Sequence, residues 1–165
     1  MASPIRLLMV VALAAAVAAP AFAGSVDVSF TDADHYLDAG NSPVQQQSYL
    51  NTLSGYLQSL GRRYLPPGQT LKLEVLDVDL AGYSRPTPRG QDLRILRNGA
   101  DWPRIVVRYT LQEQGRMLAQ GEEAITDMDY LHHIADRRTD TSLGHEKRML
   151  DEWFRARFAH SHRAD

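Results

Sequence analysis

The pattern of apolar and polar positions predicts a strand and then a long helix between residues 26 and 64. Residues 26–30 alternate between apolar and polar side chains, which is the period-two pattern of a half-buried strand. A helix is expected from Ser42 to about Tyr64, because leucines and tyrosines recur there at helical spacing after a Ser-Pro start. Pro66-Pro67-Gly68 then ends the helix.

Residues 70–80 form the longest predicted strand, and their apolar phase changes part-way along. Apolar side chains share one face up to Val75 and the other face from Leu76 onward. This change predicts either burial on both faces or a bulge near Val75-Leu76. The order strand, helix, strand also implies a right-handed crossover that makes these two strands parallel.

The second half of the chain predicts further strands and a final helix. Residues 81–91 are rich in Gly, Pro and Arg and are expected to form a loop, either a lid or simply a long connection. A short edge strand at Leu93 and Ile95, closed by Asn98-Gly99, would follow. The remaining predicted elements are strands at 105–111 and 117–126 joined at Gln114-Gly115, a short helix around Tyr130–Ile134, and a helix with an aromatic inner face over 142–160.

These elements predict an α+β fold in the order β-α-β-β-β-β-α-α. A mixed sheet of four or five strands would carry the two long helices packed on one face. Residues 24–160 are expected to form a single domain, and residues 161–165 a frayed tail. A chain of this size can bury a stable core without covalent cross-links.

Residues 1–23 have the features of a cleavable signal peptide. Arg6 precedes an apolar run over residues 7–19, and Ala21-Phe22-Ala23 has the small-x-small pattern that signal peptidase cleaves. The run is too short to cross roughly 30 Å of hydrocarbon as a helix, although a retained anchor is the alternative. We therefore expect cleavage after Ala23, a periplasmic or secreted location, and no membrane span afterwards.

The composition narrows the chemistry of the mature protein. The absence of cysteine excludes disulfides, thiolate metal ligands and cysteine nucleophiles. A nucleic-acid partner is not expected, because the chain has 18 Lys and Arg against 20 Asp and Glu. Six arginines lie between Arg85 and Arg108, with only Asp92 and Asp101 as acidic residues. This stretch is either a solvated face or a surface for phosphates and carboxylates of the envelope.

Five ordered motifs resemble an exported proteobacterial family catalogued as domain of unknown function 3016. The motifs span roughly residues 26–158 and are Tyr64-Leu65-Pro66-Pro67-Gly68-Gln69, Asp77-Val78-Asp79-Leu80-Ala81-Gly82, Asp101-Trp102-Pro103-Arg104, Asp127-Met128-Asp129-Tyr130-Leu131 and Glu146-Lys147-Arg148-Met149-Leu150-Asp151-Glu152-Trp153-Phe154. The resemblance implies an exported single domain. It implies no activity, ligand or cofactor for any residue.

Asp77 and Asp79 are the leading candidates for a site. Two carboxylates two residues apart on a strand project from one face, about 7 Å apart at their Cα atoms. Without a bulge they would point into the core, where carboxylates need partners. The functional interpretation is a Ca²⁺ or Mg²⁺ site. The structural interpretation is a cluster paired with Arg104 or Arg108, and because two ligands make no cage, no metal or cofactor is predicted.

Two weaker constellations remain. Trp102, between Asp101 and Arg104, is either an exposed ligand platform or a plug at the end of the sheet. His132 and Asp136 lie four apart, with His133 beside them, at a spacing that metals can use, but zinc needs more ligands. The candidate ligand-binding residues are therefore Asp77, Asp79, Asp101, Trp102 and Arg104, with no catalytic residue assigned.

Two functional hypotheses follow from these features. The first is a non-catalytic binding or accessory module of the cell envelope, with an envelope component or periplasmic protein as its partner. The second is a metal-assisted hydrolase that uses Asp77 and Asp79. The sequence identifies neither the partner nor the oligomeric state.

Overall fold

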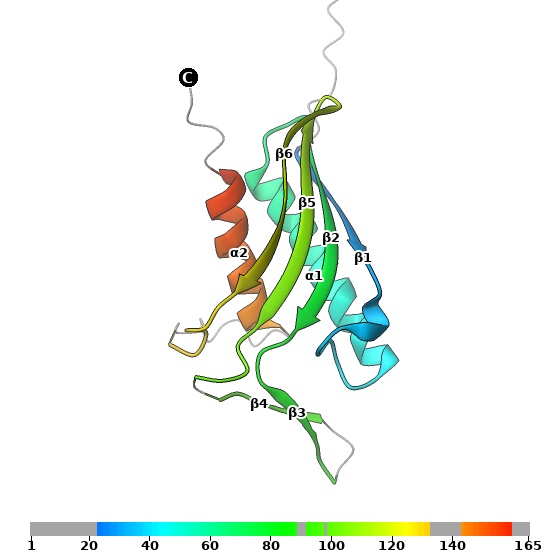
Figure 1. The fold of residues 1–165 in the computed structure, drawn as a ribbon, viewed down its shortest axis with the longest axis vertical. Helices are drawn as coiled ribbons and strands as arrows, with labels where there is room; N and C mark the ends of the chain where they lie inside the picture. The colour runs from blue at the N-terminus through cyan, green and yellow to red at the C-terminus, as the bar shows by residue number, and fades with distance from the viewer. Residues whose placement is uncertain (1–22, 89–91, 98, 133–142, 160–165) are drawn as a thin grey trace, which may run out of the picture.

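The computed structural model describes residues 23–88, 92–97, 99–132 and 143–159 (Figure 1). The predicted signal peptide, apart from its last residue, and the predicted tail lie outside these residues. The elements are β1 (Ser25–Phe30), a 3₁₀ turn η1 (Ala33–His35), α1 (Pro43–Tyr64), β2 (Gln69–Asp79), β3 (Tyr83–Pro86), β4 (Asp92–Ile95), β5 (Arg104–Glu113), β6 (Arg116–Thr126) and α2 (Gly144–Phe158). The predicted α+β class is confirmed.

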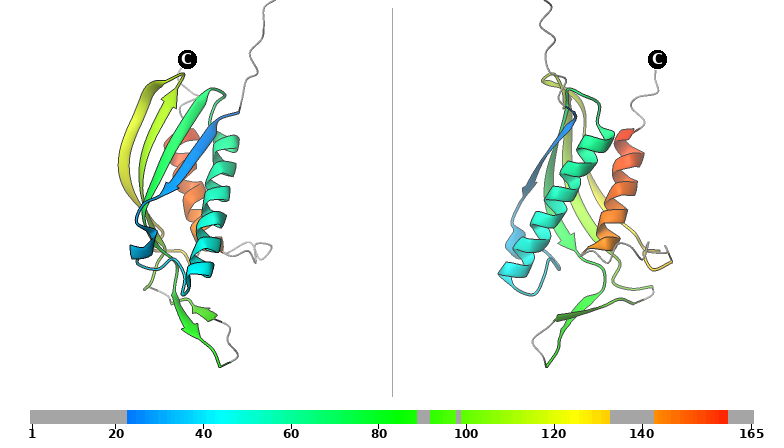
Figure 2. Two further views of the ribbon diagram at one scale, coloured as in Figure 1. Left: turned by 90° about the vertical axis from the view of Figure 1, so that its right-hand side faces the viewer. Right: turned by 180° about the vertical axis from the view of Figure 1, so that it is seen from behind.

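The main sheet has four strands in the order β1-β2-β5-β6. β1 pairs with β2 in parallel, as predicted, and the other pairs are antiparallel. Both helices cover the same face of this sheet, which leaves the other face without helices (Figure 2). Neither helix in the described part of the chain is long and apolar enough to span a membrane.

β3 and β4 form a separate two-stranded sheet that projects from one end of the domain (Figure 1). The predicted edge strand at Leu93 and Ile95 therefore belongs to this hairpin and does not extend the main sheet. Its partner β3 lies inside the predicted loop over 81–91. Four residues ending in proline carry too little alternation to distinguish a strand from a loop.

The expected short helix around Tyr130–Ile134 is absent over its described part. Residues 128–132 form a turn, and residues 133 and 134 lie outside the described range. Aspartates stabilise this turn, because the Asp127 carboxylate accepts the Asp129 N–H at 3.1 Å and the Asp129 carbonyl accepts the His132 N–H at 2.9 Å.

The phase change in β2 is a β-bulge, one of the two predicted alternatives. The pairing register with β5 shifts between Val75 and Asp77. The Val75 carbonyl accepts the Thr31 N–H at 3.0 Å and the Tyr36 hydroxyl at 2.8 Å. Burial raises the pKa of Tyr36 to about 12, so its hydroxyl remains a donor at neutral pH. The bulge buries Val78 on the helix-covered face and turns Asp77 away from it.

The core lies between the sheet and the two helices. Helix α1 begins as expected, with Pro43 in its first turn and the Ser42 hydroxyl accepting the Gln45 N–H at 3.2 Å. Its leucines are buried against apolar residues of β1, β2 and β5. Helix α2 contributes the predicted aromatic face, and the edge-to-face ring pairs join Tyr109, Trp153, Phe154 and Phe158.

Two glycines of α1 give a matched test of this packing. A Cβ at Gly61 would lie 2.4 Å from the Cγ2 atom of Val26 in β1, whereas a Cβ at Gly55 would meet nothing within 4 Å. We expect Gly61→Ala to lower the free energy of unfolding by about 1–3 kcal/mol through overpacking. Gly55→Ala should raise it by roughly 0.5–1 kcal/mol, because alanine loses less backbone entropy in a helix. Urea denaturation of both variants measures the difference, and equal effects would contradict this packing.

Candidate functional site

Three of the predicted site residues meet where β2 ends and β5 begins. Asp77 and Asp79 lie near the end of β2, and Arg104 is the first residue of β5 and pairs in register with Asp79. Asp38 joins them from the segment after η1, because it forms an isolated parallel bridge with Asp79. We call Asp38, Asp77, Asp79 and Arg104 the strand-end cluster. Asp38 was missed in the sequence because nothing distinguishes it within the polar stretch 31–41.

Asp77 is an arginine-paired structural carboxylate. Its Oδ2 atom accepts a hydrogen bond from Arg104 Nη1 at 3.1 Å, and its Oδ1 atom accepts the Leu37 N–H at 3.1 Å. Arg108, the other expected cation, instead pairs with Glu74 at 2.8 Å and with Glu122 at 3.0 Å. Both oxygens of Asp77 are therefore engaged, one with the chain after η1 and the other with β5.

The Asp79 carboxylate makes no hydrogen bond or ion pair with the rest of the described chain. Burial raises the pKa of Asp79, and the charges of Asp38, Asp77 and Asp101 raise it further, while Arg104 opposes the change. The folded state thus holds a partly buried negative charge near three others. Of the predicted site residues, Asp79 has the least favourable electrostatic environment.

We call β3 and β4 the arm, and four side chains fix its base to the domain. Arg94 donates to the Asp38 carboxylate at 3.0 Å and to the Ala81 carbonyl at 2.8 Å. The buried Glu146 carboxylate, in the first turn of α2, accepts the Ala81 N–H at 2.8 Å. The buried Tyr130 hydroxyl donates to the Arg97 carbonyl at 3.0 Å, and Asn41 hydrogen-bonds to Ser84. The face of the arm that carries Ser84 and Arg94 is therefore held against the domain.

The opposite face of the arm points into solvent. Tyr83 pairs in register with Ile95, and Arg85 pairs with Leu93, so these four side chains share one face. Tyr83 is 41% exposed and Leu93 is 56% exposed. The Arg97 guanidinium lies 5.0 Å from the centre of the Tyr83 ring. These five residues form what we call the outer face of the arm.

The two arginines of the outer face differ in their partners. Arg97 Nε donates to the Asp101 carboxylate at 2.6 Å. The exposed Arg85 makes no ion pair with the described residues. The structure therefore pairs Asp101 with Arg97 at the base of the arm, close enough to Asp79 for its charge to raise the pKa of that carboxyl group. The sequence indicated the richness in arginine, but not which arginines face outward.

Trp102 lies between the arm and β5 and is 36% exposed. This exposure does not fit a buried plug at the end of the sheet, because its neighbour Pro103 is the buried residue there. A contact role for the Trp102 indole stays a prediction.

The histidine constellation is described only in part. His132 contacts the Asp129 carboxylate, and both side chains are more than half exposed. His133 and Asp136 lie outside the described residues. Among the residues that the structure describes, no group of three or more His, Asp or Glu side chains is placed to hold a metal ion.

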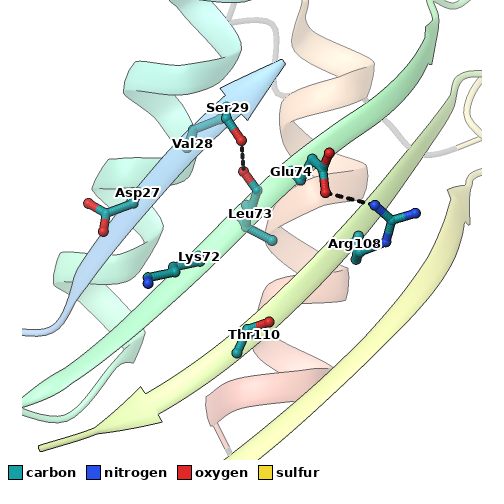
Figure 3. A pocket seen from close by; sticks show the side chains of 8 residues that line it. All are labelled: Asp27, Val28, Ser29, Lys72, Leu73, Glu74, Arg108 and Thr110. Atoms are coloured by element: carbon teal, nitrogen blue, oxygen red, sulfur yellow. Dashed lines mark hydrogen bonds and ion pairs between the residues drawn. The ribbon is translucent and has the colours of Figure 1, made fainter. Parts of the chain in front are cut away.

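A concavity of about 380 Å³ lies on the helix-free face of the sheet (Figure 3). Its lining comes from β1, β2 and β5 and consists of Asp27, Val28, Ser29, Lys72, Leu73, Glu74, Arg108 and Thr110. Glu74 pairs with Arg108 inside it, and Asp27 lies opposite Lys72 in the strand register. Its acidic and basic side chains are matched in number, so it lacks the unpaired charge found at Asp79 and Arg85.

The family was established by comparison with known proteins. Residues 24–156 match the family described as "Protein of unknown function (DUF3016)". The chain belongs to this family. No curated protein and no solved structure matches the chain. Membership in the family assigns no activity to the strand-end cluster or to the arm.

Replacing Asp79 tests the electrostatics of the strand-end cluster. Asp79→Asn should raise the free energy of unfolding at pH 7, because it removes a charge that burial and three neighbouring carboxylates disfavour. The raised pKa means that the folded state binds this proton more tightly than the unfolded state does. The gain should therefore shrink as the pH falls and vanish below 3.8, the ordinary pKa of an aspartate.

Asp77→Asn is the matched control. It breaks the ion pair with Arg104 and should lower the free energy of unfolding at pH 7 by up to about 1 kcal/mol. Chemical denaturation at several pH values measures both variants. If Asp79→Asn also destabilised the protein at pH 7, Asp79 would hold a stabilising contact and our description of its environment would be wrong.

Proposed function

We propose that this protein is an exported, non-catalytic binding module of the cell envelope, and that the outer face of the arm is its contact surface. The observation that carries the proposal is the composition of this face. Tyr83, Leu93 and Ile95 are flanked by arginines, and tyrosine and arginine are the residues enriched where proteins make strong contacts.

The attachment of the arm supports a contact role. A two-stranded hairpin alone is marginally stable in water. Here Arg94, Glu146 and Tyr130 bind backbone groups on both sides of the hairpin. An element held in place before binding loses less conformational entropy when it binds.

The export part of the proposal rests on residues 1–23. Their basic, apolar and Ala-Phe-Ala segments follow the order of a cleavable signal peptide. The family match begins at residue 24, the first residue after the expected cleavage position. Both observations support a mature protein that begins at Gly24.

The geometry favours binding over the metal-assisted hydrolase hypothesis. Both oxygens of Asp77 already accept a hydrogen bond, from Arg104 and from the Leu37 N–H, so a divalent ion would compete with these partners. Asp79 alone offers a single carboxylate, whereas Ca²⁺ takes six to eight oxygen ligands. We therefore assign Asp77 to the support of the strand end.

Fractionation of producing cells tests the proposed function. We expect the protein to be trimmed after Ala23 and recovered with the envelope. The double variant Tyr83→Ser/Leu93→Ser should shift most of it to the soluble periplasmic fraction, because its apolar contacts are lost. The control Val44→Ser/Met128→Ser removes side chains that are 82% and 65% exposed elsewhere and should leave the distribution unchanged.

Two results would contradict this proposal. Untrimmed protein in the cytosol would remove the export step. Equal distributions of the wild type, the arm variant and the control would remove the arm as the contact surface.

A further inference from the structure

The outer face of the arm has a positive charge that no ion pair with the described residues compensates. Arg85 is exposed and unpaired within the described chain, and Tyr83, Leu93 and Ile95 beside it bear no charge. Arg97 is paired with Asp101, but its guanidinium also lies over the Tyr83 ring and remains about half exposed. Guanidinium groups bind phosphate oxygens through two parallel hydrogen bonds.

We infer that the outer face of the arm binds the surface of an anionic lipid bilayer. This inference rests on the proposed function and names the partner of the same face. Arg85 pairs with lipid phosphates, while Leu93 and Tyr83 enter between the headgroups. Tyrosine is enriched at that depth of a membrane because its ring is apolar and its hydroxyl is polar.

The backbone of the arm sets the depth of this contact. A two-stranded sheet leaves one edge of each strand unpaired, and unpaired N–H and C=O groups are costly in hydrocarbon. The arm therefore remains in the hydrated headgroup region, with only its apolar side chains reaching further. This mode of binding is peripheral and reversible.

The charge of the rest of the protein orients it on such a surface. The whole chain has more acidic than basic residues, so an anionic membrane repels the domain and attracts the arm. The arm lies at one end of the longest axis (Figure 1), which lets it approach before the rest of the domain. At its base, Asp38 and Asp101 are already neutralised by Arg94 and Arg97, so they oppose this attraction only weakly.

Vesicle co-sedimentation with the purified protein tests this inference. The probes are vesicles of phosphatidylcholine alone and vesicles with about one third phosphatidylglycerol, whose negative charge attracts basic residues. We expect binding to the anionic vesicles only, weakened by salt. Arg85→Glu should reduce the affinity about tenfold or more, since it reverses a charge that contacts the surface. Leu93→Ser should also reduce it.

Arg62→Glu is the matched control. It makes the same change of charge at an exposed position in the last turn of α1, at the opposite end of the domain from the arm (Figure 2). It should retain the wild-type affinity within about twofold. Thermal unfolding of all three variants verifies that they are folded, as expected for exposed positions.

The outcomes separate this inference from the proposed function. Absence of binding to anionic vesicles, or equal losses for Arg85→Glu and Arg62→Glu, would overturn the lipid assignment. Suppose instead that the arm variant leaves the envelope fraction in cells, while purified wild-type protein does not bind the vesicles. The partner would then be an envelope component other than the lipid surface. The proposed function would then stand and the lipid inference would fail.

Discussion

The bulge at Val75–Asp77 is the constraint on which the arrangement of this domain depends. A strand of regular period that kept Leu73 and Val75 in the core would also bury Asp77 and Asp79. The same strand would direct Val78 and Leu80 away from the core. One extra residue resolves the conflict, because the apolar side chains on both sides of it reach the same core. Thr31 and Tyr36 bind the Val75 carbonyl at this point. The strand can thus end in carboxylates that remain outside the core.

The end of the sheet is organised by arginine–carboxylate pairs that each join separate segments. Arg104 links β5 to Asp77 of β2, and Arg94 links the arm to Asp38. Asp79 is the exception, since it lies among these pairs but forms none with the part of the chain that the structure describes. Proteins retain unfavourable charges of this kind when stability is not the only property under selection. The cluster combines support for the arm with a local electrostatic cost.

The sequence predicted most of the fold and little of the surface. The helix that starts at Ser42, the parallel pair, the bulge and the aromatic face around Trp153 all have strong periodic or capping signals. The hairpin of β3 and β4 was not predicted, because the strand Tyr83–Pro86 is short and its pairing depends on contacts with Asp38 and Glu146. The sequence also grouped Asp101 with Asp77 and Asp79. The charge of Asp101 does act on Asp79, but its ion-pair partner is Arg97.

The parallel pairing of β1 with β2 has a consequence for how the chain acquires its structure. Ser25 lies beside Thr70, and the hydroxyls of this pair are 45 residues apart in sequence. The amino-terminal strand therefore has no neighbour until α1 and β2 exist, and closing so long a loop is slow. A polypeptide that passes through a narrow channel with its amino terminus first would emerge extended. It would become compact only after its middle third had followed.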